Sequence, residues 1–250
     1  MVKLIRYGLA GWLPGGQYFC IACGQRIWKF MPYRRGSRSK PALMQALEII
    51  GSDIDNFECP RCGAHDRERH LLLYLDYSGL FQRMGNSRVL HMAPERHLSK
   101  LIATYRPSEY IMGDLCPSSP DIAKLDLMEL PFEACTFDFV LANHVLEHVA
   151  NDYLTLTEVY RVLKPAGYAI LQTPFSPILH RTWDDRGITE SSVRLQAFGQ
   201  EDHVRLYGRD IVSRFSASGL VPHISTHTEL LPEIDSGVYG VNRAEPFFLF

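Results

Sequence analysis

Residues 124–148 read Lys-Leu-Asp-Leu-Met-Glu-Leu-Pro-Phe-Glu-Ala-Cys-Thr-Phe-Asp-Phe-Val-Leu-Ala-Asn-His-Val-Leu-Glu-His. A short apolar strand ends at Asp126, a Leu-Pro-Phe turn follows at 130–132, and residues 137–141 form a second strand that runs into a helix-like stretch over 143–148. Polar groups at two strand ends suit an adenosine, because they accept hydrogen bonds from it while apolar neighbours sandwich the ring. The alternative is two core strands joined by an ordinary turn.

Outward from this stretch, short apolar runs alternate with helical stretches from residue 87 onward. This pattern predicts an α/β fold with a doubly wound, mostly parallel sheet. Strands are expected at 88–92, 110–114, 123–127, 137–142, 168–173, 220–225 and 246–250, and helices at 98–105, 153–163 and 209–218. Ligands of such sheets lie outside the carboxyl ends of the strands, where Ala93, Asp114, Asp126 and Asn143 fall.

The motifs resemble those of the class I S-adenosylmethionine-dependent methyltransferases, in which a strand ending in Asp, then Leu-Pro-Phe, then Phe-Asp-x-Val recurs. Residues 161–171, Arg-Val-Leu-Lys-Pro-Ala-Gly-Tyr-Ala-Ile-Leu, are similar to the same family. The resemblance covers residues 87–175 and agrees more loosely beyond them. It implies a Rossmann-like, seven-stranded sheet and S-adenosylmethionine as the cofactor.

The resemblance also implies which residues contact the cofactor. Asp114 ends the second strand and would accept the ribose hydroxyls, although a carboxylate that only caps its own turn is the alternative. Asp126 and Leu127 match the pair that contacts adenine, and Asn143 ends the fourth strand.

The loop after the first strand departs from the family, which has glycines where this chain has Ala93, Glu95 and His97. The usual acidic position is His91. We expect Ala93 to lie against the cofactor and Glu95 to pair with its α-ammonium group. The alternative is a protein that has kept the fold and lost cofactor binding.

Three histidines are candidate catalytic residues. Methyl transfer from a sulfonium mainly needs proximity and orientation, with a general base when the nucleophile is a hydroxyl or a carbon acid. His144, His148 and His203 are candidate bases because histidine titrates near neutral pH. The resemblance favours His148, since Glu147-His148 recurs at this place in the family, and a packed or capping histidine is the alternative for each.

The acceptor is expected to be a small molecule. Residues 175–208 form an insertion rich in aromatic and charged residues, which suits a lid over a polar or carbohydrate-like substrate. Asp202, His203, Arg205 and Tyr207 are its candidate contacts. Residues 143–146, Asn-His-Val-Leu, differ from the Asn/Asp-Pro-Pro-Tyr/Phe sequence of the family's nucleic-acid branch, which argues against exocyclic amines of DNA bases.

Two Cys-x-x-Cys-Gly turns, with ligands Cys20, Cys23, Cys59 and Cys62, predict a closed tetrahedral S₄ site. Thiolate ligands favour a structural zinc, with iron not excluded, and disulfides are the alternative. The module resembles a zinc ribbon with a helix inserted at 41–50. We expect residues 1–66 to form this module, 67–86 a connecting helix, and 87–250 the cofactor-binding domain.

Composition sets the remaining limits. The 250 residues are 46% hydrophobic and 22% charged, which is ordinary for a globular chain. Residues 1–70 hold 11 Lys and Arg against 6 Asp and Glu. This basic module makes an RNA methyltransferase one alternative to an enzyme that methylates small molecules. The other alternative is an inactive binding protein. No apolar run suits a membrane helix or a signal peptide, so a cytoplasmic location is expected, and the oligomeric state is open.

Overall fold

A five-stranded parallel sheet forms the framework of the chain, in the order β5-β4-β3-β6-β7. Its strands are β3 (Arg88–Met92), β4 (Glu109–Asp114), β5 (Ala123–Lys124), β6 (Phe137–Ala142) and β7 (Leu163–Ile170). Every neighbouring pair is parallel. The computed structural model describes residues 2–250, and side chains from Arg6 onward.

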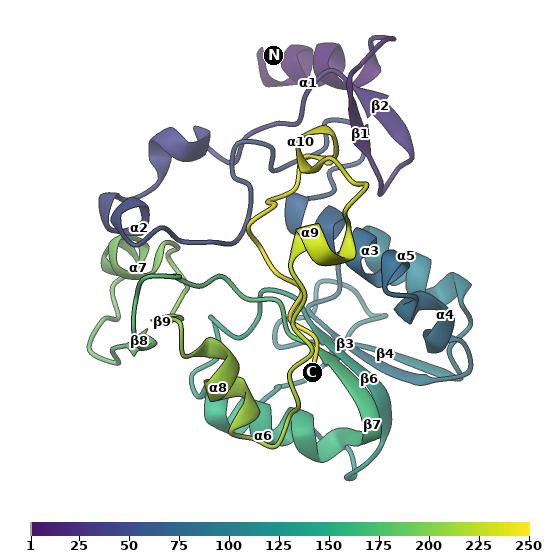
Figure 1. Cartoon of the computed structure of the whole chain (residues 1–250), viewed down its shortest axis with the longest axis vertical. Helices are drawn as coiled ribbons and strands as arrows, with labels where there is room; N and C mark the ends of the chain where they lie inside the picture. The colour runs from purple at the N-terminus through teal and green to yellow at the C-terminus, as the bar shows by residue number, and fades with distance from the viewer. Residues whose placement is uncertain (1) are drawn as a thin grey trace.

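Helices cover both faces of this sheet, as a doubly wound fold requires (Figure 1). Helices α3 (Asp66–Tyr77), α4 (Leu80–Met84) and α5 (Arg96–Thr104) pack on one face, and α6 (Asp152–Val162) and α8 (Ile211–Ser216) pack on the other. Successive strand residues alternate between the two cores: Val89 joins the first, and Leu90 joins the second. The predicted α/β class and doubly wound sheet are confirmed.

The last two predicted strands continue the sheet beyond β7 only as isolated bridges. The amide of Ala169 donates to the Phe250 carbonyl (2.9 Å), and the amide of Phe247 donates to the Ser225 carbonyl (2.7 Å). Both pairings are antiparallel. The sheet therefore has five strands where seven were expected, because the two final segments pair at single bridges and form no continuous ladder.

Several predicted elements are shorter than expected. The helix at 41–50 is reduced to α2 (Ala42–Ala46), since Glu48 takes a φ of 50° that a helix cannot contain. The connecting helix at 67–86 is divided into α3 and α4 by Gly79, whose φ is 71°. The strand at 123–127 ends at Lys124, and residues 143–148 form turns in place of the helix-like stretch.

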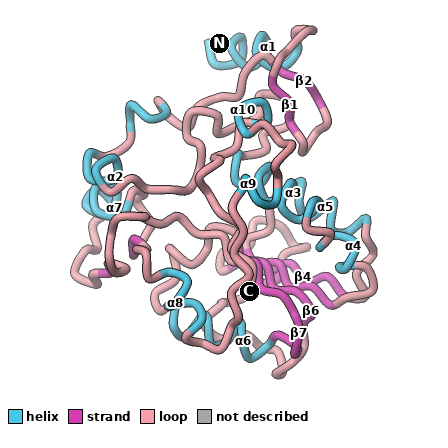
Figure 2. The backbone as a smooth tube through the Cα atoms, in the orientation of Figure 1, coloured by secondary structure: helices cyan, strands magenta, loops and turns pink. Residues whose placement is uncertain are grey.

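The N-terminal part holds α1 (Val2–Trp12), a hairpin of β1 (Tyr18–Cys20) and β2 (Gln25–Ile27), and a 3₁₀ turn at Gly36–Ser39. Helix α2 packs on α7 (Ser191–Phe198) of the insertion through Met44, Ala197 and Phe198. The insertion also holds β8 (Trp183–Asp184) paired with β9 (Arg205–Leu206). Figure 2 shows that much of the chain outside the sheet is loop.

The C-terminal segment runs from α9 (His227–Leu230) and α10 (Ser236–Tyr239), beside the N-terminal module, down to the sheet (Figure 1). It therefore links the two parts of the molecule. Within residues 2–250, no helix has the length and apolar character needed to cross a bilayer.

Candidate functional site

The register of the sheet aligns the ends of three strands at one edge. Met92 of β3 lies beside Gly113 of β4 and beside Ala142 of β6. The next residues, Ala93, Asp114 and Asn143, therefore follow the three strands at the same level. Strand order reverses between β3 and β6, and the crevice at such a reversal is where open α/β sheets bind ligands.

The loop after β3 is held by its own polar network. Ala93 takes a φ of 48°, a left-handed conformation for which glycine is favoured, and its amide donates to the Gly113 carbonyl (2.7 Å). Glu95, just before α5, contacts Nε2 of His91 (3.0 Å) and accepts a hydrogen bond from Asn143. Burial raises the pKa of Glu95, but the His91 contact outweighs burial and holds that pKa below its ordinary value.

Glu95 is thus a half-buried carboxylate that already has partners, and its predicted contact with the cofactor's ammonium stays a prediction. The sequence indicated its position but not its bond to Asn143, which comes from a distant strand. His91 takes part in the same network, since its Nδ1 lies 2.8 Å from the hydroxyl of Tyr110.

Asp114 and Asp126 each use one carboxylate oxygen to cap a turn. Oδ1 of Asp114 accepts from the amide of Cys116 (2.7 Å), and Oδ1 of Asp126 accepts from the amide of Met128 (2.8 Å). Both side chains are half-buried, whereas Leu127 is buried. Turn capping and ligand binding are compatible here, because the capping bond uses Oδ1 and each carboxylate has a second oxygen.

His144 lies between two buried carboxylates. Its Nε2 is 3.1 Å from Oε1 of Glu245, and its Nδ1 is 3.4 Å from Oε1 of Glu147. Burial lowers the pKa of His144, but contact with Glu147 and Glu245 raises it to about 9. The same contacts oppose the effect of burial on the two carboxylates and lower both pKa values to about 2. His144 is therefore held as a cation at neutral pH.

A buried chain of polar groups continues from His144 away from the sheet. Oε2 of Glu245 lies 3.2 Å from Nδ1 of His70, whose Nε2 is 2.9 Å from Nδ1 of His227. His227 in turn reaches the Ile234 carbonyl (3.0 Å). Sequence reasoning missed Glu245 and His70, since no local motif marks either residue.

His148 and His203 lie on either side of Glu147. Oε1 of Glu147 is 4.0 Å from Nε2 of His148 and 3.9 Å from Nε2 of His203. The two rings are edge to face, with centroids 4.7 Å apart. Burial lowers the pKa of His203, so its imidazole is neutral at pH 7. The structure therefore brings the three predicted catalytic histidines together around one carboxylate.

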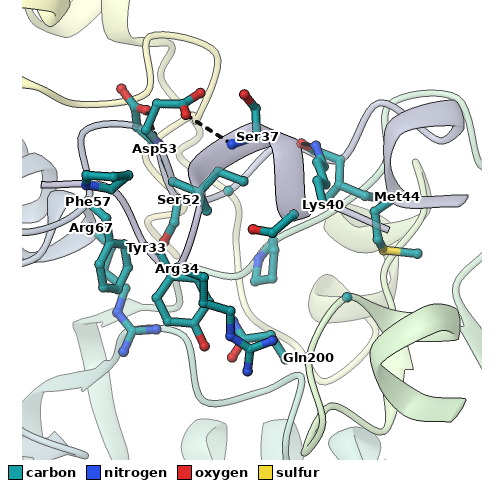
Figure 3. Close-up of a pocket in the computed structure, with 18 of the residues that line it drawn as sticks. Tyr33, Arg34, Ser37, Lys40, Met44, Ser52, Asp53, Phe57, Arg67 and Gln200 are labelled. Atoms are coloured by element: carbon teal, nitrogen blue, oxygen red, sulfur yellow. Dashed lines mark hydrogen bonds between the residues drawn. The ribbon is translucent and has the colours of Figure 1, made fainter. Parts of the chain in front are cut away.

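A cavity of about 1270 Å³ opens beside these histidines, between the N-terminal part, the insertion and the turn after β6. His144 and His203 line it, but of the residues that the structure describes none of the six predicted cofactor residues does. Figure 3 shows Phe57 and Arg67 on one side of it and Lys40 and Met44 on the opposite side. Nε of Arg67 is buried and has no hydrogen-bond partner among the described residues.

Two of the predicted lid contacts also have structural roles. The guanidinium of Arg205 is buried and donates to the carbonyls of Leu146 and Val149 (2.6 Å each). The hydroxyl of Tyr207 donates to Asp152 (2.9 Å). These bonds fasten the insertion to the turn after β6. Arg205 also lines the cavity, and its Nε has no hydrogen-bond partner among the described residues, so both contacts with the substrate stay predictions.

The four cysteine thiols of the two Cys-x-x-Cys-Gly turns converge within 4.8 Å of one another. Each turn closes by a glycine amide donating to the first cysteine's carbonyl, from Gly24 (2.8 Å) and from Gly63 (2.9 Å), both with positive φ. Sγ of Cys20 lies 3.7 Å from Sγ of Cys62. Zinc–sulfur bonds of about 2.3 Å in a tetrahedron place sulfurs about 3.8 Å apart, so the thiols fit a zinc ion.

Residues 80–171 match the family model described as a methyltransferase domain. A curated relative, 2-phytyl-1,4-beta-naphthoquinone methyltransferase, chloroplastic, from Arabidopsis thaliana, is 27% identical over 146 residues. The match covers 58% of this chain and 47% of the relative, so the chain spans about half the relative's length.

Similar solved structures include the YcgJ protein from Bacillus subtilis, with 21% identity, a TM-score of 0.44 and coverage of 60% of this chain and 70% of that one. Another is an S-adenosylmethionine-dependent methyltransferase from Mesorhizobium loti, with 15% identity, a TM-score of 0.47 and coverage of 70% and 94%. Both TM-scores are below 0.5.

Proposed function

We propose, because residues 80–171 match the methyltransferase-domain family model, that the chain transfers a methyl group from S-adenosylmethionine to a small polar or carbohydrate-like acceptor. The observation that carries the proposal is the alignment of Ala93, Asp114 and Asn143 at the reversal of strand order. A cofactor in that crevice would have the cavity beside it for the acceptor, because Asn143 is followed directly by cavity-lining His144.

Each cofactor contact is assigned from the position of its side chain. The free oxygen of Asp114 would accept the ribose hydroxyls, and Asp126 with Leu127 would bind the adenine. Ala93 would lie against the methionine part, where its left-handed backbone turns the chain away from the ligand. The pair Glu95 and Asn143 would close the crevice from the β6 side.

In the reaction, a nucleophilic atom of the acceptor bonds to the methyl carbon as the carbon–sulfur bond breaks and its electron pair returns to sulfur. The products are the methylated acceptor and S-adenosylhomocysteine. The proton lost by the acceptor goes to His148 or His203, the candidates that remain available as bases. His144 suits charge stabilisation better, because two carboxylates keep it protonated.

The cavity supports a polar acceptor. Arg67 would meet an oxygen or an anionic group of the acceptor, because its buried Nε needs an acceptor of hydrogen bonds. Lys40 lies across the cavity and has its ammonium 3.2 Å from the Ile49 carbonyl. A volume of about 1270 Å³ is large for a single small molecule, and it accommodates a sugar-sized acceptor with its ordered water.

Calorimetric titration with S-adenosylmethionine and S-adenosylhomocysteine tests the proposal. We expect micromolar binding that Asp114→Ala weakens at least about tenfold, which is about 1.4 kcal/mol. Asp121→Ala, an exposed aspartate in the following loop, is the matched control and should bind as the wild type does.

Folded, zinc-loaded protein that binds neither molecule would contradict the proposal and favour an inactive binding protein. If the cofactor binds, an acceptor screen follows. An RNA acceptor would be indicated by RNA affinity that falls steeply with salt, because counterions are released from the phosphates.

A further inference from the structure

Glu147, His148 and His203 form a cluster of hydrogen-bond acceptors beside the cavity. Glu147 and His148 belong to the turn after β6, and His203 arrives from the insertion. The backbone fixes this meeting, because the amide of Val204 donates to the Glu147 carbonyl (2.9 Å). Arg205 adds its bonds to the carbonyls of the same turn.

Each histidine is oriented through its outer nitrogen. Nδ1 of His203 lies 3.0 Å from the Phe198 carbonyl, which can only accept, so this nitrogen carries the proton. Nε2 of His203 therefore presents a lone pair, and it is buried with no hydrogen-bond partner in the described part of the chain. Nδ1 of His148 lies 3.2 Å from Oδ2 of Asp202, which is also an acceptor. This contact orients the ring so that Nε2 of His148 faces Glu147.

The carboxylate at the centre is also short of donors. Glu147 is 1% exposed, and for both of its oxygens the described residues supply no hydrogen-bond donor in good geometry. The ion pair with His144 at 3.4 Å offsets part of the cost of burying this charge. Among the described residues, the His144 imidazolium, 3.4 Å from Oε1, is the charged partner of the Glu147 carboxylate, and the two imidazole lone pairs that face this carboxylate have no donor of their own. A metal cation would be shared by all three acceptors.

We propose that Glu147, His148 and His203 bind one divalent transition-metal cation. Their ligand atoms lie within 4.8 Å of one another. Ligands of a tetrahedral zinc ion at about 2.1 Å lie roughly 3.4 Å apart, so each Glu147–histidine separation must shorten by about half an ångström. Two imidazoles and one carboxylate suit zinc, iron(II) or manganese(II), and outer partners such as Asp202 and the Phe198 carbonyl are usual for histidine ligands.

Three protein ligands would leave a coordination position open, and one of the three, His203, lines the cavity. The role of the cation rests on the proposed function. An acceptor oxygen bound at an open position would lose its proton more readily to water in the cavity, and it would then attack the methyl carbon. On this assignment His148 and His203 are metal ligands, and water takes the place that the proposed function gives them as proton acceptors.

Titration with Co²⁺ tests the site in the full chain, after one equivalent of Zn²⁺ has been supplied for the four cysteines. We expect one further Co²⁺ per chain, with visible absorption but no sulfur-to-cobalt charge-transfer band. His148→Ala and Glu147→Gln should each weaken this binding at least about tenfold. His180→Ala, an exposed histidine of the same insertion, should bind as the wild type does.

Absence of Co²⁺ binding in the zinc-loaded wild type, or equal Co²⁺ affinity in the wild type and both variants, would overturn the proposal. His148 is half-buried and Glu147→Gln preserves shape, so circular dichroism can confirm that both variants fold. Binding of S-adenosylhomocysteine is measured on the same samples. If the protein binds S-adenosylhomocysteine but no Co²⁺, the metal-site proposal is wrong and the proposed function is still supported. If it binds Co²⁺ but no S-adenosylhomocysteine, the proposed function is wrong and the metal site is still supported.

Discussion

Asp66, the first residue of α3, is a fully buried carboxyl group. Its Oδ2 accepts a hydrogen bond from the amide of Asp53, and its Oδ1 is buried with no hydrogen-bond partner that the described residues supply. Burial raises the pKa of Asp66 from its ordinary 3.8 to about 7. The folded protein therefore holds this proton more tightly than the unfolded chain does.

The pH dependence of stability follows with a definite sign. Between pH 4 and 7 the unfolded state loses the proton first, so the free energy of unfolding falls as the pH rises through this window. We expect Asp66→Asn to remove this dependence, which amounts to about 4 kcal/mol between the two limits. Urea unfolding at pH 4, 6 and 8 measures it.

The matched control for Asp66→Asn is Asp76→Asn, an exposed position in the last turn of the same helix. The control should follow the wild type at every pH. Equal pH profiles for the wild type and Asp66→Asn would contradict the assignment.

At the scale of elements, Arg69 of α3 connects the N-terminal part to the C-terminal segment. Its guanidinium is buried and donates to the carbonyls of Ala64 (2.7 Å), Asn56 (2.6 Å) and Tyr239 (3.1 Å). The group also lies 3.8 Å from the centroid of the Phe30 ring. The guanidinium therefore joins two segments, residues 56–64 just before α3 and the stretch at Tyr239, which lies 170 residues farther along the chain.

We expect Arg69→Lys to lower the free energy of unfolding by about 3 kcal/mol or more, because an ammonium cannot reach all these carbonyls and leaves some buried without a donor. Arg67→Lys is the control: it lies on the same helix, lines the cavity and should change stability by less than about 1 kcal/mol. Chemical denaturation compares them. A similar loss in both variants would show that Arg69 has no special part in joining the segments.

At the scale of the whole molecule, the four-cysteine site packs with Phe30 and Ala64 of the N-terminal module, and Arg69 couples that module to the rest of the chain by donating to the Ala64 and Tyr239 carbonyls. Loss of a structural zinc should therefore destabilise the whole chain, and its effect should not be limited to the N-terminal module. We expect Cys59→Ser to lose one zinc per chain and to unfold at least about 10 °C lower, which corresponds to roughly 4 kcal/mol.

Cys135→Ser, at an exposed cysteine outside the cluster, controls for the substitution itself. Elemental analysis and a thermal scan of both variants give the answer. Equal zinc content and equal midpoints would show that the four thiols do not hold a structural metal.

Local patterns in the amino-acid sequence were enough for the parallel α/β sheet, because strands β3 and β6 are buried apolar runs and the half-buried β4 carries a short apolar run of its own, each bounded by turn residues. They also predicted the two cysteine turns, since each turn is a contact between residues three apart. The length of α2 was predicted wrongly, because the backbone conformation at Glu48 ends the helix early. The last two segments were predicted as strands, and they pair in the structure at isolated antiparallel bridges.

The candidate site divides in the same way. Ala93, Asp114 and Asn143 could be placed together from sequence, because parallel strands end at one edge of a sheet. The sequence could not predict that Glu245 lies beside His144 or that His203 lies beside Glu147, because each contact joins segments far apart in the chain. Those contacts set the charge of His144 and assemble the acceptor cluster, and they exist only because the insertion and the C-terminal segment fold back onto the turn after β6.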